Sequence, residues 1–406
     1  MDNKKNILYV LHSGTSGGTF DTTLDLIKNL KDSFNIYILG AENDHFILYN
    51  YCEGKVNTIT VFQRYDKWSA KTFHNSWLTY IYFEILTEYN IDLIHIMHLI
   101  NHSFDLPQIA KKLKIPIILS FHDYYFVCPN FCLLNENYEY CGGICSDNHE
   151  NCKLNWNIFD DIHFKTFLPT WREHVQNLFK YVDVFISSSP IVKNIFSTAY
   201  PNMKTIFDSK FIIIEHGRDF PKFNQVLFDY PSRNAPLKIA FPANQLNEMK
   251  GSEIIKDIKK LDKKNELEFH FLGNVPESLE EYGINHGPYL RDDFNNCIEE
   301  IKPSFIGIFS ICPETYCHTL TESWNAKIPV IGTNVGVIED RISKNKGGII
   351  IDRNIQKCYS TLINLKNLSK KDYESLLDDV SKIFIKTTAD MAKEYLNIYD
   401  SLLKST

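Results

Sequence analysis

The order of apolar segments along the chain is the sequence feature that most constrains its fold. Short continuous runs rich in Ile, Leu and Val alternate with longer segments of helical periodicity, and the alternation occurs twice, on either side of residues 220–236. Continuous apolar runs are typical of parallel strands that helices cover on both faces. Two such series predict an α/β protein with two doubly wound, Rossmann-like domains.

The boundaries of the predicted elements follow from these runs. In the first series we expect a helix at Thr19–Lys31 and strands at Asn6–His12, Phe34–Gly40, Asp92–Met97, Pro116–His122 and Asp183–Ser188. In the second series we expect helices at Gly251–Leu261 and His318–Ala326 and strands at Leu237–Pro242, Glu268–Leu272, Ser304–Ser310 and Ile328–Gly332. A final helix, about Ala389–Lys404, has no strand after it and is expected to pack back on the first domain.

Residues 220–236 contain three prolines together with Asn and Ser, a composition typical of a linker. A chain of 406 residues is long enough for two domains. We therefore predict an N-terminal domain at 1–225, a C-terminal domain at 226–385 and a closing segment at 386–406. Residues 124–169 interrupt the first domain without a clear strand or helix period. Ligands of such sheets bind beyond the carboxyl ends of the strands, so we expect a central cleft between the domains.

Charge and hydropathy exclude several classes of protein. A formal net charge of −7 argues against a nucleic-acid-binding protein, which needs a basic surface. No apolar run approaches the roughly 18 residues of a spanning helix, and Ile7–Leu11 is too short for a signal-peptide core. We expect a cytoplasmic protein. Lys111, Lys112 and Lys114 form either a solvated face or a contact with anionic lipid at the inner face of the cell membrane.

The segment Cys312–Trp324 carries the strongest chemical signal. It follows a predicted strand and leads into a predicted helix. The N–H groups of Cys317, His318 and Thr319 would point out of the N-terminus of that helix. Such a helix N-terminus is a site where a diphosphate binds well.

Two glutamates accompany this helix. Glu314 lies on the loop before it, and Glu322 lies one turn into it. Alone, such glutamates are more often surface residues. However, Pro313–Glu322 followed by Ile328–Gly336 resembles the donor-binding signature of family-4 retaining glycosyltransferases of the GT-B fold. In that family the first glutamate lies by the donor sugar and the second holds the nucleotide ribose.

A second segment resembles the same family. Ala243–Gly251 follows the first strand of the second domain and opens a helix. The family has Gly-Arg-Leu-x-x-x-Lys-Gly there, and its two cations grip the donor diphosphate. Lys250 and Gly251 match, whereas Gln245 stands in the place of the arginine. The resemblance implies that Lys250 and backbone N–H donors together stabilise the leaving diphosphate.

The first domain has matching features. His12–Thr19 is a Gly-rich turn between a strand and a helix, but it is not Gly-x-Gly-x-x-Gly, so it does not predict a Rossmann dinucleotide site. The resemblance implies that Gly17 and Gly18 belong to a loop that closes over the donor phosphates. His122, followed by Asp123, matches the His-Asp motif of the family, which implies a role in binding the sugar and the acceptor.

Other polar residues also follow predicted strands of the first domain. Those assigned to the acceptor side are His98, Asn101, His102 and Arg218. For any single histidine, a core residue with satisfied hydrogen bonds is the alternative. His122–Pro129, Tyr140–Gly142, Trp171-Arg172 and Pro313–Tyr316 are similar to motifs of a subgroup that assembles bacterial surface polysaccharides, including rhamnose-containing glycans.

Five of the ten cysteines lie within residues 128–152. Reduced thiols at this spacing either form a tetrahedral structural zinc site or remain free. The zinc ligands would be Cys128, Cys141, Cys145 and Cys152.

These patterns predict a retaining, metal-independent glycosyltransferase with Glu314, His122 and Lys250 as catalytic residues. It would transfer a sugar from a UDP-, GDP- or dTDP-linked donor to a glycan or lipid-linked saccharide in bacterial surface-polysaccharide synthesis. No cofactor is expected for catalysis, and the sequence lacks the D-x-D motif of manganese-dependent glycosyltransferases. The alternatives are a GT-B sugar-nucleotide epimerase, which needs no acceptor, and a non-catalytic sugar-binding protein or partner subunit.

Overall fold

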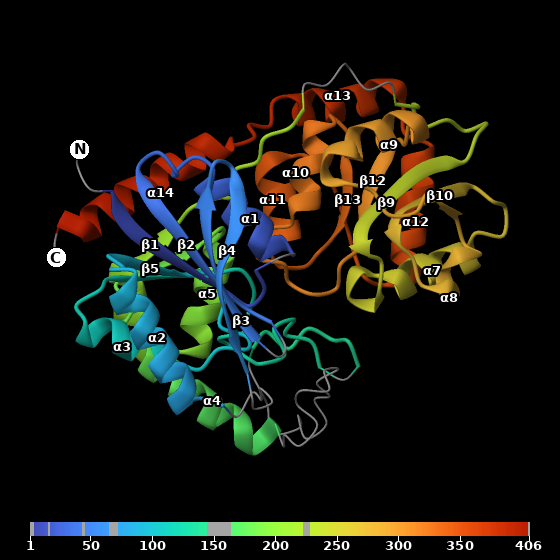
Figure 1. Cartoon of the computed structure of the whole chain (residues 1–406). Coiled ribbons are helices and arrows are strands. Elements are labelled where there is room, and N and C mark those ends of the chain that lie inside the picture. Colours follow the sequence, from blue (N-terminus) through green and yellow to red (C-terminus); the bar gives the residue numbers. More distant parts are fainter. Residues whose placement is uncertain are drawn as a thin grey trace. The chain divides into compact units, whose positions relative to one another are not determined.

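The structure, a computed structural model, describes residues 4–14, 17–42, 45–64, 72–135, 137–143, 164–221 and 228–404. The chain divides into two compact units, both drawn in Figure 1. The first unit is formed within Met1–Glu136, Cys141–Arg218 and Lys386–Thr406, and the second within Asn137–Tyr140 and Asp219–Ile385. The predicted boundary between residues 225 and 226 lies outside the described residues.

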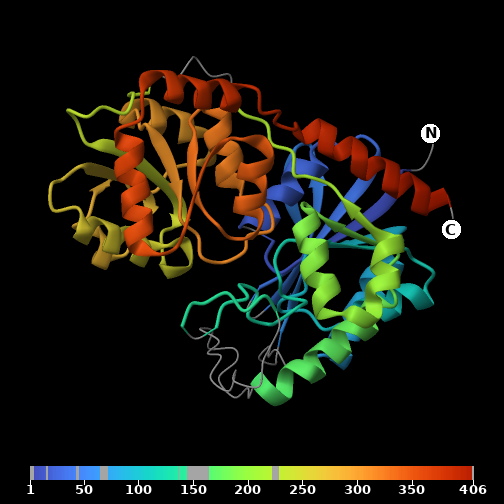
Figure 2. The same ribbon diagram turned by 180° about the vertical axis from the view of Figure 1, so that it is seen from behind.

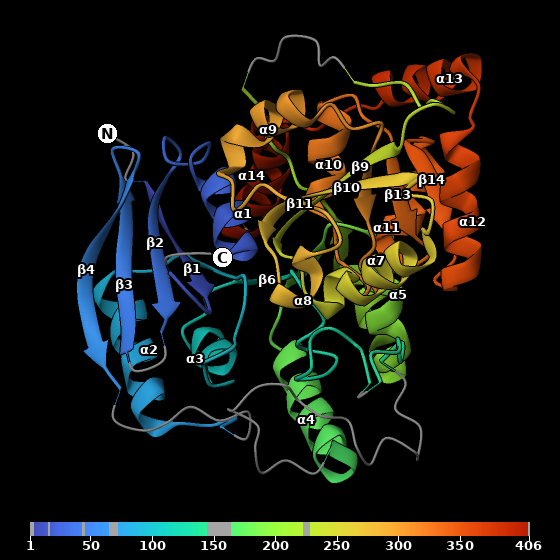
Figure 3. The same ribbon diagram turned by 90° about the vertical axis from the view of Figure 1, so that its right-hand side faces the viewer.

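The first unit is built on an eight-stranded sheet, counted over the described residues, in the order β4-β3-β2-β1-β5-β6-β7-β8. Neighbouring strands in the series β2-β1-β5-β6-β7-β8 pair in parallel. At one edge of the sheet, which Figure 3 shows, β3 pairs antiparallel with both β2 and β4. The strands are β1 (Lys5–Leu11), β2 (Phe34–Ala41), β3 (His45–Cys52), β4 (Lys55–Gln63), β5 (Leu93–Ile96), β6 (Ile117–Phe121), β7 (Val184–Ser187) and β8 (Phe211–Ile213).

Helices cover both faces of this sheet because successive strand residues point to opposite sides. Leu8 and Val10 of β1 belong to the core beneath one group of helices, and Tyr9 and Leu11 to the core beneath the other. The first group is α2 (Ser76–Glu88), α3 (Leu106–Lys112), α4 (Phe164–Phe179), α5 (Pro190–Ala199) and α6 (Lys204–Lys210). The second group is α1 (Gly18–Ile27) and α14 (Thr388–Lys404).

The last helix, α14, belongs to the first unit, as the sequence predicts. Figures 1 and 2 show it, in red, beside the blue α1 and β1. Its Tyr399 hydroxyl lies 2.6 Å from Nδ1 of His95 and 2.9 Å from the Tyr9 hydroxyl. Nε2 of His95 lies 2.7 Å from Oγ of Ser120. This buried polar chain joins the C-terminal helix to three neighbouring strands of the sheet.

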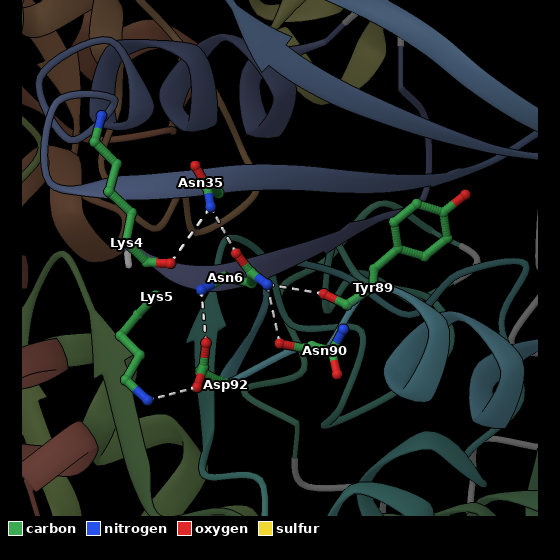
Figure 4. Close-up of polar contacts among 7 residues, drawn as sticks. All are labelled: Lys4, Lys5, Asn6, Asn35, Tyr89, Asn90 and Asp92. Atoms are coloured by element: carbon green, nitrogen blue, oxygen red, sulfur yellow. Dashed lines mark hydrogen bonds and ion pairs between the residues drawn. The ribbon is translucent and has the colours of Figure 1, made fainter. Parts of the chain in front are cut away.

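The edge at the amino ends of the strands is closed by structural hydrogen bonds, drawn in Figure 4. Asp92 accepts a bond from the backbone N–H of Asn6 at 2.8 Å. The Asn6 side chain donates to the carbonyls of Tyr89 and Asn90 at 2.9 and 3.1 Å and accepts from Asn35 at 2.8 Å. The polar groups at this edge therefore serve the fold, whereas candidate functional residues gather at the carboxyl ends.

The second unit has a six-stranded sheet within the described residues, in the order β11-β10-β9-β12-β13-β14, and every pairing is parallel. The strands are β9 (Leu237–Gln245), β10 (Leu267–Asn274), β11 (Ile284–Asn285), β12 (Phe305–Ile308), β13 (Val330–Thr333) and β14 (Gly348–Ile351). The helices are α7 (Ser252–Leu261), α8 (Glu277–Glu280), α9 (Phe294–Ile301), α10 (His318–Asn325), α11 (Gly336–Asn345), α12 (Ile355–Lys366) and α13 (Lys370–Ser381). Two hydrophobic cores again lie on opposite faces of the sheet.

The prediction of two Rossmann-like α/β sheets is confirmed. One boundary is corrected. The sequence predicts an irregular segment from 124 to 169, but α4 begins at Phe164 and contains Pro169 in its interior. Proline lacks an N–H donor and usually ends a helix, at a cost of about 3 kcal/mol in its interior. The helix continues because Leu168, Trp171 and Val175 are buried in the core of the unit.

None of the helices in the described ranges combines the length and hydropathy needed to cross a membrane.

Candidate functional site

Lys250 and Glu314 form an ion pair at the carboxyl ends of two neighbouring strands of the second unit. Lys250 ends the short 3-10 helix η3 (Glu248–Lys250) after β9, and Glu314 lies in the loop after β12. Nζ of Lys250 is 2.5 Å from Oε1 of Glu314. Oγ of Ser310 donates a hydrogen bond to the same oxygen at 2.9 Å. The sheet thus brings together two predicted residues that are 64 positions apart.

Opposing effects set the charge of this pair. Burial by itself raises the pKa of Glu314, but the charge of Lys250 and hydrogen bonds from Lys250, Ser310 and Cys317 hold it below its usual value. Burial by itself lowers the pKa of Lys250, but the charge of Glu314 raises it above its usual value. Both groups are therefore ionised near neutral pH. The Lys250 side chain remains 38 % exposed, so a ligand can reach it.

Gly251 brings η3 against the end of β12. Its φ of 86° lies in the left-handed region. A Cβ atom at this position would lie 2.2 Å from the carbonyl oxygen of Phe309. The backbone N–H of Ile311 also donates to the carbonyl of Met249 at 3.0 Å. The close approach requires glycine, and it places Lys250 beside the loop that carries Glu314.

That loop ends in a tight turn at Cys317, the N-cap residue of α10. Cys317 has φ 65° and ψ 82° and makes no side-chain capping bond. The backbone N–H groups at the start of α10, including those of His318 and Thr319, form the end of a helix that attracts anions. Glu322 lies one turn into α10 and is buried.

The loop contains two cysteines, Cys312 and Cys317, and neither forms a disulfide. Burial raises the pKa of Cys312 to about 11 and that of Cys317 further. A protonated thiol is a poor nucleophile, so both residues pack in the loop and do not serve as nucleophiles. Gln245, the residue in place of the expected arginine, is exposed at the end of β9.

In the first unit, His98 and Asp123 lie at the carboxyl ends of β5 and β6. Nδ1 of His98 accepts a hydrogen bond from the N–H of Ile100 at 3.0 Å, so the ring proton is on Nε2, which donates to Asp123 at 3.0 Å. Asp123 also accepts from the N–H of Tyr125 at 2.8 Å. Burial opposes ionisation of Asp123, but His98 and these hydrogen bonds lower its pKa, so it is a carboxylate.

Three further histidines lie at the carboxyl ends of strands in this sheet. His12, directly after β1, lies with its ring centroid 4.6 Å from that of His98. Burial, aided by the neighbouring His98, lowers the pKa of His12 to about 3. His122, directly after β6, stacks on His216, which follows β8, at 5.5 Å. Burial lowers the pKa of His122 to about 4. His12 and His122 are therefore neutral imidazoles at the carboxyl edge of this sheet.

Ser310, His12 and His216 also lie at strand ends, although none of them is among the predicted site residues. Each follows a strand directly or within three residues, which is the signal that identifies them. Arg218, which is assigned, follows His216 closely and is buried. Its backbone N–H donates to the carbonyl of Lys386 at 2.9 Å.

His102 is placed inside the unit. It is 1 % exposed, its Nε2 donates to the carbonyl of Leu11 at 2.8 Å, and its Nδ1 lies 3.1 Å from the Tyr82 hydroxyl. Burial lowers its pKa to about 3. Both ring nitrogens have internal partners, so His102 is a core histidine that holds the end of β1. Asn101 has φ 68°, and its carbonyl accepts from Arg64 at 3.3 Å.

The Gly-rich turn after β1 is described only at its ends. Ser13 Oγ and the N–H of Gly14 lie 3.3 and 3.2 Å from Oε1 of Glu42. Gly17, with φ 101°, precedes α1, and a Cβ atom at Gly17 or Gly18 would meet no atom within 4 Å. Both glycines therefore leave open space beside the start of α1.

The zinc hypothesis concerns two residues outside the described part of the chain, Cys145 and Cys152. Of the others, Cys128 is buried, and the thiol of Cys141 donates to the carbonyl of Leu133 at 3.2 Å. Burial raises the pKa of Cys141. In the described ranges no group of three or more His, Cys, Asp or Glu side chains is arranged to hold a metal ion. The zinc site stays a prediction.

No protein-family model and no curated protein matches the sequence. Solved structures, by contrast, resemble it over its whole length. A glycosyltransferase from Rickettsia africae has a TM-score of 0.64 at 17% identity, with 100% of both chains covered. The catalytic domain of starch synthase IV from Arabidopsis thaliana, bound to ADP and acarbose, has a TM-score of 0.61 at 13% identity, covering 99% of this chain and 100% of that one.

A third structure, Alr3699/HepE from Anabaena in complex with UDP, has a TM-score of 0.62 at 11% identity and covers 98% of this chain and 100% of that one. These similarities define the class of the fold. The chain has the GT-B fold of glycosyltransferases.

Proposed function

We propose that the protein is a retaining glycosyltransferase that transfers a sugar from a nucleoside-diphosphate sugar to a glycan or lipid-linked saccharide. The observation that carries this proposal is the Lys250–Glu314 ion pair beside the start of α10. A cation, a carboxylate and helix N–H groups thus meet at the carboxyl edge of a parallel sheet, where such folds bind nucleotides.

Each group has a role in this proposal. Lys250 contacts the donor diphosphate and offsets the negative charge that develops as the diphosphate leaves. The N–H groups at the start of α10 bind the same diphosphate. These groups supply the positive charge that a metal ion would otherwise provide, so we propose catalysis without a metal. Glu314 holds Lys250 and orients the donor sugar, and Glu322 binds the ribose.

The first unit supplies the acceptor side in this proposal. His122 binds the sugar and the acceptor hydroxyl, assisted by Asn101. The His98 side chain is 2 % exposed, and its two ring nitrogens are engaged by Asp123 and by the Ile100 N–H, so in this proposal it positions Asp123 and does not itself contact the saccharide. The same proposal includes a role in bacterial surface-polysaccharide synthesis, contact with the inner face of the membrane, and a UDP-, GDP- or dTDP-linked donor.

Bound ligands of similar structures support a nucleotide donor. The Anabaena protein is described in complexes with UDP and with UDP-glucose, and the starch synthase domain with ADP. Their identities of 11 to 13% leave the base and the sugar of the present protein to experiment.

Binding of nucleoside diphosphates tests the proposal directly. A ligand that binds only the folded state raises the melting temperature, so we expect one of UDP, GDP, dTDP or ADP to raise it. In Lys250→Met, affinity for that nucleotide should fall by about tenfold or more, because a charge-assisted phosphate contact is lost. Lys260→Met is the matched control, because Lys260 is exposed on α7 and pairs with Asp257.

The proposal would be contradicted if none of the four nucleotides raised the melting temperature. It would also be contradicted if Lys250→Met and Lys260→Met lost nucleotide affinity equally. Once a donor is known, proton NMR of the product reports whether the anomeric configuration of the sugar is retained. Epimerisation of the donor without an acceptor would favour the epimerase alternative.

A further inference from the structure

Arg341 of α11 holds the turn before α10 through hydrogen bonds. Its Nη1 donates to the carbonyl oxygens of Tyr316 and Cys317 at 2.7 and 3.0 Å. Its Nη2 donates to Oγ1 of Thr321 at 3.0 Å. The guanidinium also lies over two aromatic rings, 4.0 Å from the centroid of Tyr316 and 5.1 Å from that of Trp324. One side chain thus holds two successive peptide carbonyls and the first turn of the helix.

The two held carbonyls determine where two N–H groups point. The carbonyl of Tyr316 and the N–H of Cys317 belong to one planar peptide unit, and the carbonyl of Cys317 and the N–H of His318 belong to the next. In a trans peptide the C=O and N–H groups point in opposite directions. Because Arg341 draws both carbonyls toward α11, the N–H groups of Cys317 and His318 are directed away from it. These are N–H groups to which the proposed function assigns the diphosphate.

The backbone conformation of this turn needs such stabilising contacts. Cys317 has φ 65°, in a region that residues other than glycine rarely adopt and that persists only where the surroundings hold it. A guanidinium is planar and offers several donors in a rigid fork, whereas the ammonium of lysine is a single point charge. Lysine at this position could not hold both carbonyls and Thr321 while stacking on Tyr316.

We propose that Arg341 is a positioning residue of the donor site, which orients the N–H groups of Cys317 and His318 toward the diphosphate. It acts through the backbone and does not itself contact the nucleotide. This inference rests on the proposed function of the second unit.

The test compares Arg341→Lys with wild type in the full-length chain. Isothermal titration is performed with UDP, GDP, dTDP and ADP, with inorganic pyrophosphate, and with the nucleoside of whichever nucleotide binds. We expect binding of the nucleoside diphosphate and of pyrophosphate to weaken by about tenfold, the effect of losing one or two ordered hydrogen bonds. Binding of the nucleoside should change by less than about twofold, because that part of the ligand lacks the phosphates.

Arg353→Lys is the matched control. Arg353 is exposed in the loop after β14, so the same substitution there should leave every affinity unchanged. A role in stability alone would lower the melting temperature of Arg341→Lys without changing the ratio of diphosphate to nucleoside affinity. If Arg341→Lys does not fold, Thr321→Val keeps the arginine, removes one of its acceptors and should weaken diphosphate binding selectively by about twofold to fivefold.

The possible results separate the two proposals. If wild type binds a nucleoside diphosphate and Arg341→Lys binds it equally well, the positioning role is wrong and the proposed function stands. Equal weakening of nucleoside and diphosphate binding also overturns the positioning role. If wild type binds no nucleoside diphosphate, the proposed function and this inference are both wrong.

Discussion

At the scale of single residues, burial sets the protonation of several histidines in the first unit. Burial lowers the pKa of His95, His102, His12 and His122, with about 3 for His12 and His102 and about 4 for His122. In the unfolded chain the usual value is about 6.5. As the pH falls below this value, the unfolded chain binds protons that the folded unit excludes.

This difference predicts a loss of stability in mild acid. Each neutral histidine makes its full contribution to the free energy of unfolding above pH 6.5. This contribution is lost as the pH falls toward the pKa of the histidine in the folded protein, at up to about 1.4 kcal/mol per pH unit. Urea denaturation followed at pH 7, 6 and 5 measures the slope. In His12→Asn the free energy of unfolding should depend less steeply on pH, by the amount that corresponds to about one proton bound on unfolding. An unchanged slope in this variant would show that His12 is not a buried neutral group in the folded protein.

Single residues also show which parts of the site a sequence can predict. Lys250, Gly251 and Glu314 were identified by motif, and their proximity follows from the parallel sheet, because β9 and β12 are neighbours. Arg341 could not be identified in this way. It lies 25 residues beyond Tyr316, on a different helix, and its role depends on a side-chain geometry that no spacing encodes. For His102, only the structure distinguishes a ligand-binding residue from a core residue.

At the scale of elements, the predicted strands were those with continuous apolar runs. The hairpin of β3 and β4 was missed because β4, a partly exposed edge strand, mixes polar and apolar residues and so has no continuous apolar run. The signal was the dipeptide Glu53-Gly54 between the strands, whose φ angles of 53° and 79° suit a tight two-residue turn. The start of helix α4 was missed because residues 124–169 were predicted to be irregular. Pro169 disfavours a helix interior, but burial of its neighbours outweighs that local preference.

The attachment of α14 leads to a prediction about stability. The Tyr399 hydroxyl lies between His95 and Tyr9, and all three groups are buried. Tyr399→Phe leaves polar groups of His95 and Tyr9 without this partner, so it should lower the free energy of unfolding by about 1–3 kcal/mol. Urea denaturation measures the effect. The control is Tyr80→Phe, because Tyr80 is 61 % exposed and its hydroxyl can be solvated by water.

If Tyr399→Phe and Tyr80→Phe unfold at the same urea concentration, the polar chain does not anchor α14. Its apolar contacts through Met391 and Ala392 would then hold the helix alone.

At the scale of the whole molecule, the two units differ in how the chain forms them. The second unit is nearly continuous, from Asp219 to Ile385, whereas the first unit needs the segment from Lys386 onward. Met391, Tyr395 and Tyr399 of α14 are part of the core on one face of the first sheet. Removal of α14 would expose this core to water, at a cost of about 25 cal/mol for each Å² of apolar surface.

This asymmetry predicts that residues 219–385 fold alone, whereas residues 1–218 do not. The fragment 219–385 contains Lys250, Glu314, Arg341 and all of α10, so it should unfold cooperatively and bind the same nucleoside diphosphate as the full chain. We expect its affinity to be weaker than that of the full chain by no more than about tenfold. Circular dichroism on heating and isothermal titration measure the two properties. A folded fragment 219–385 that binds no nucleotide, beside a full chain that does, would mean that the first unit supplies an essential part of the donor site.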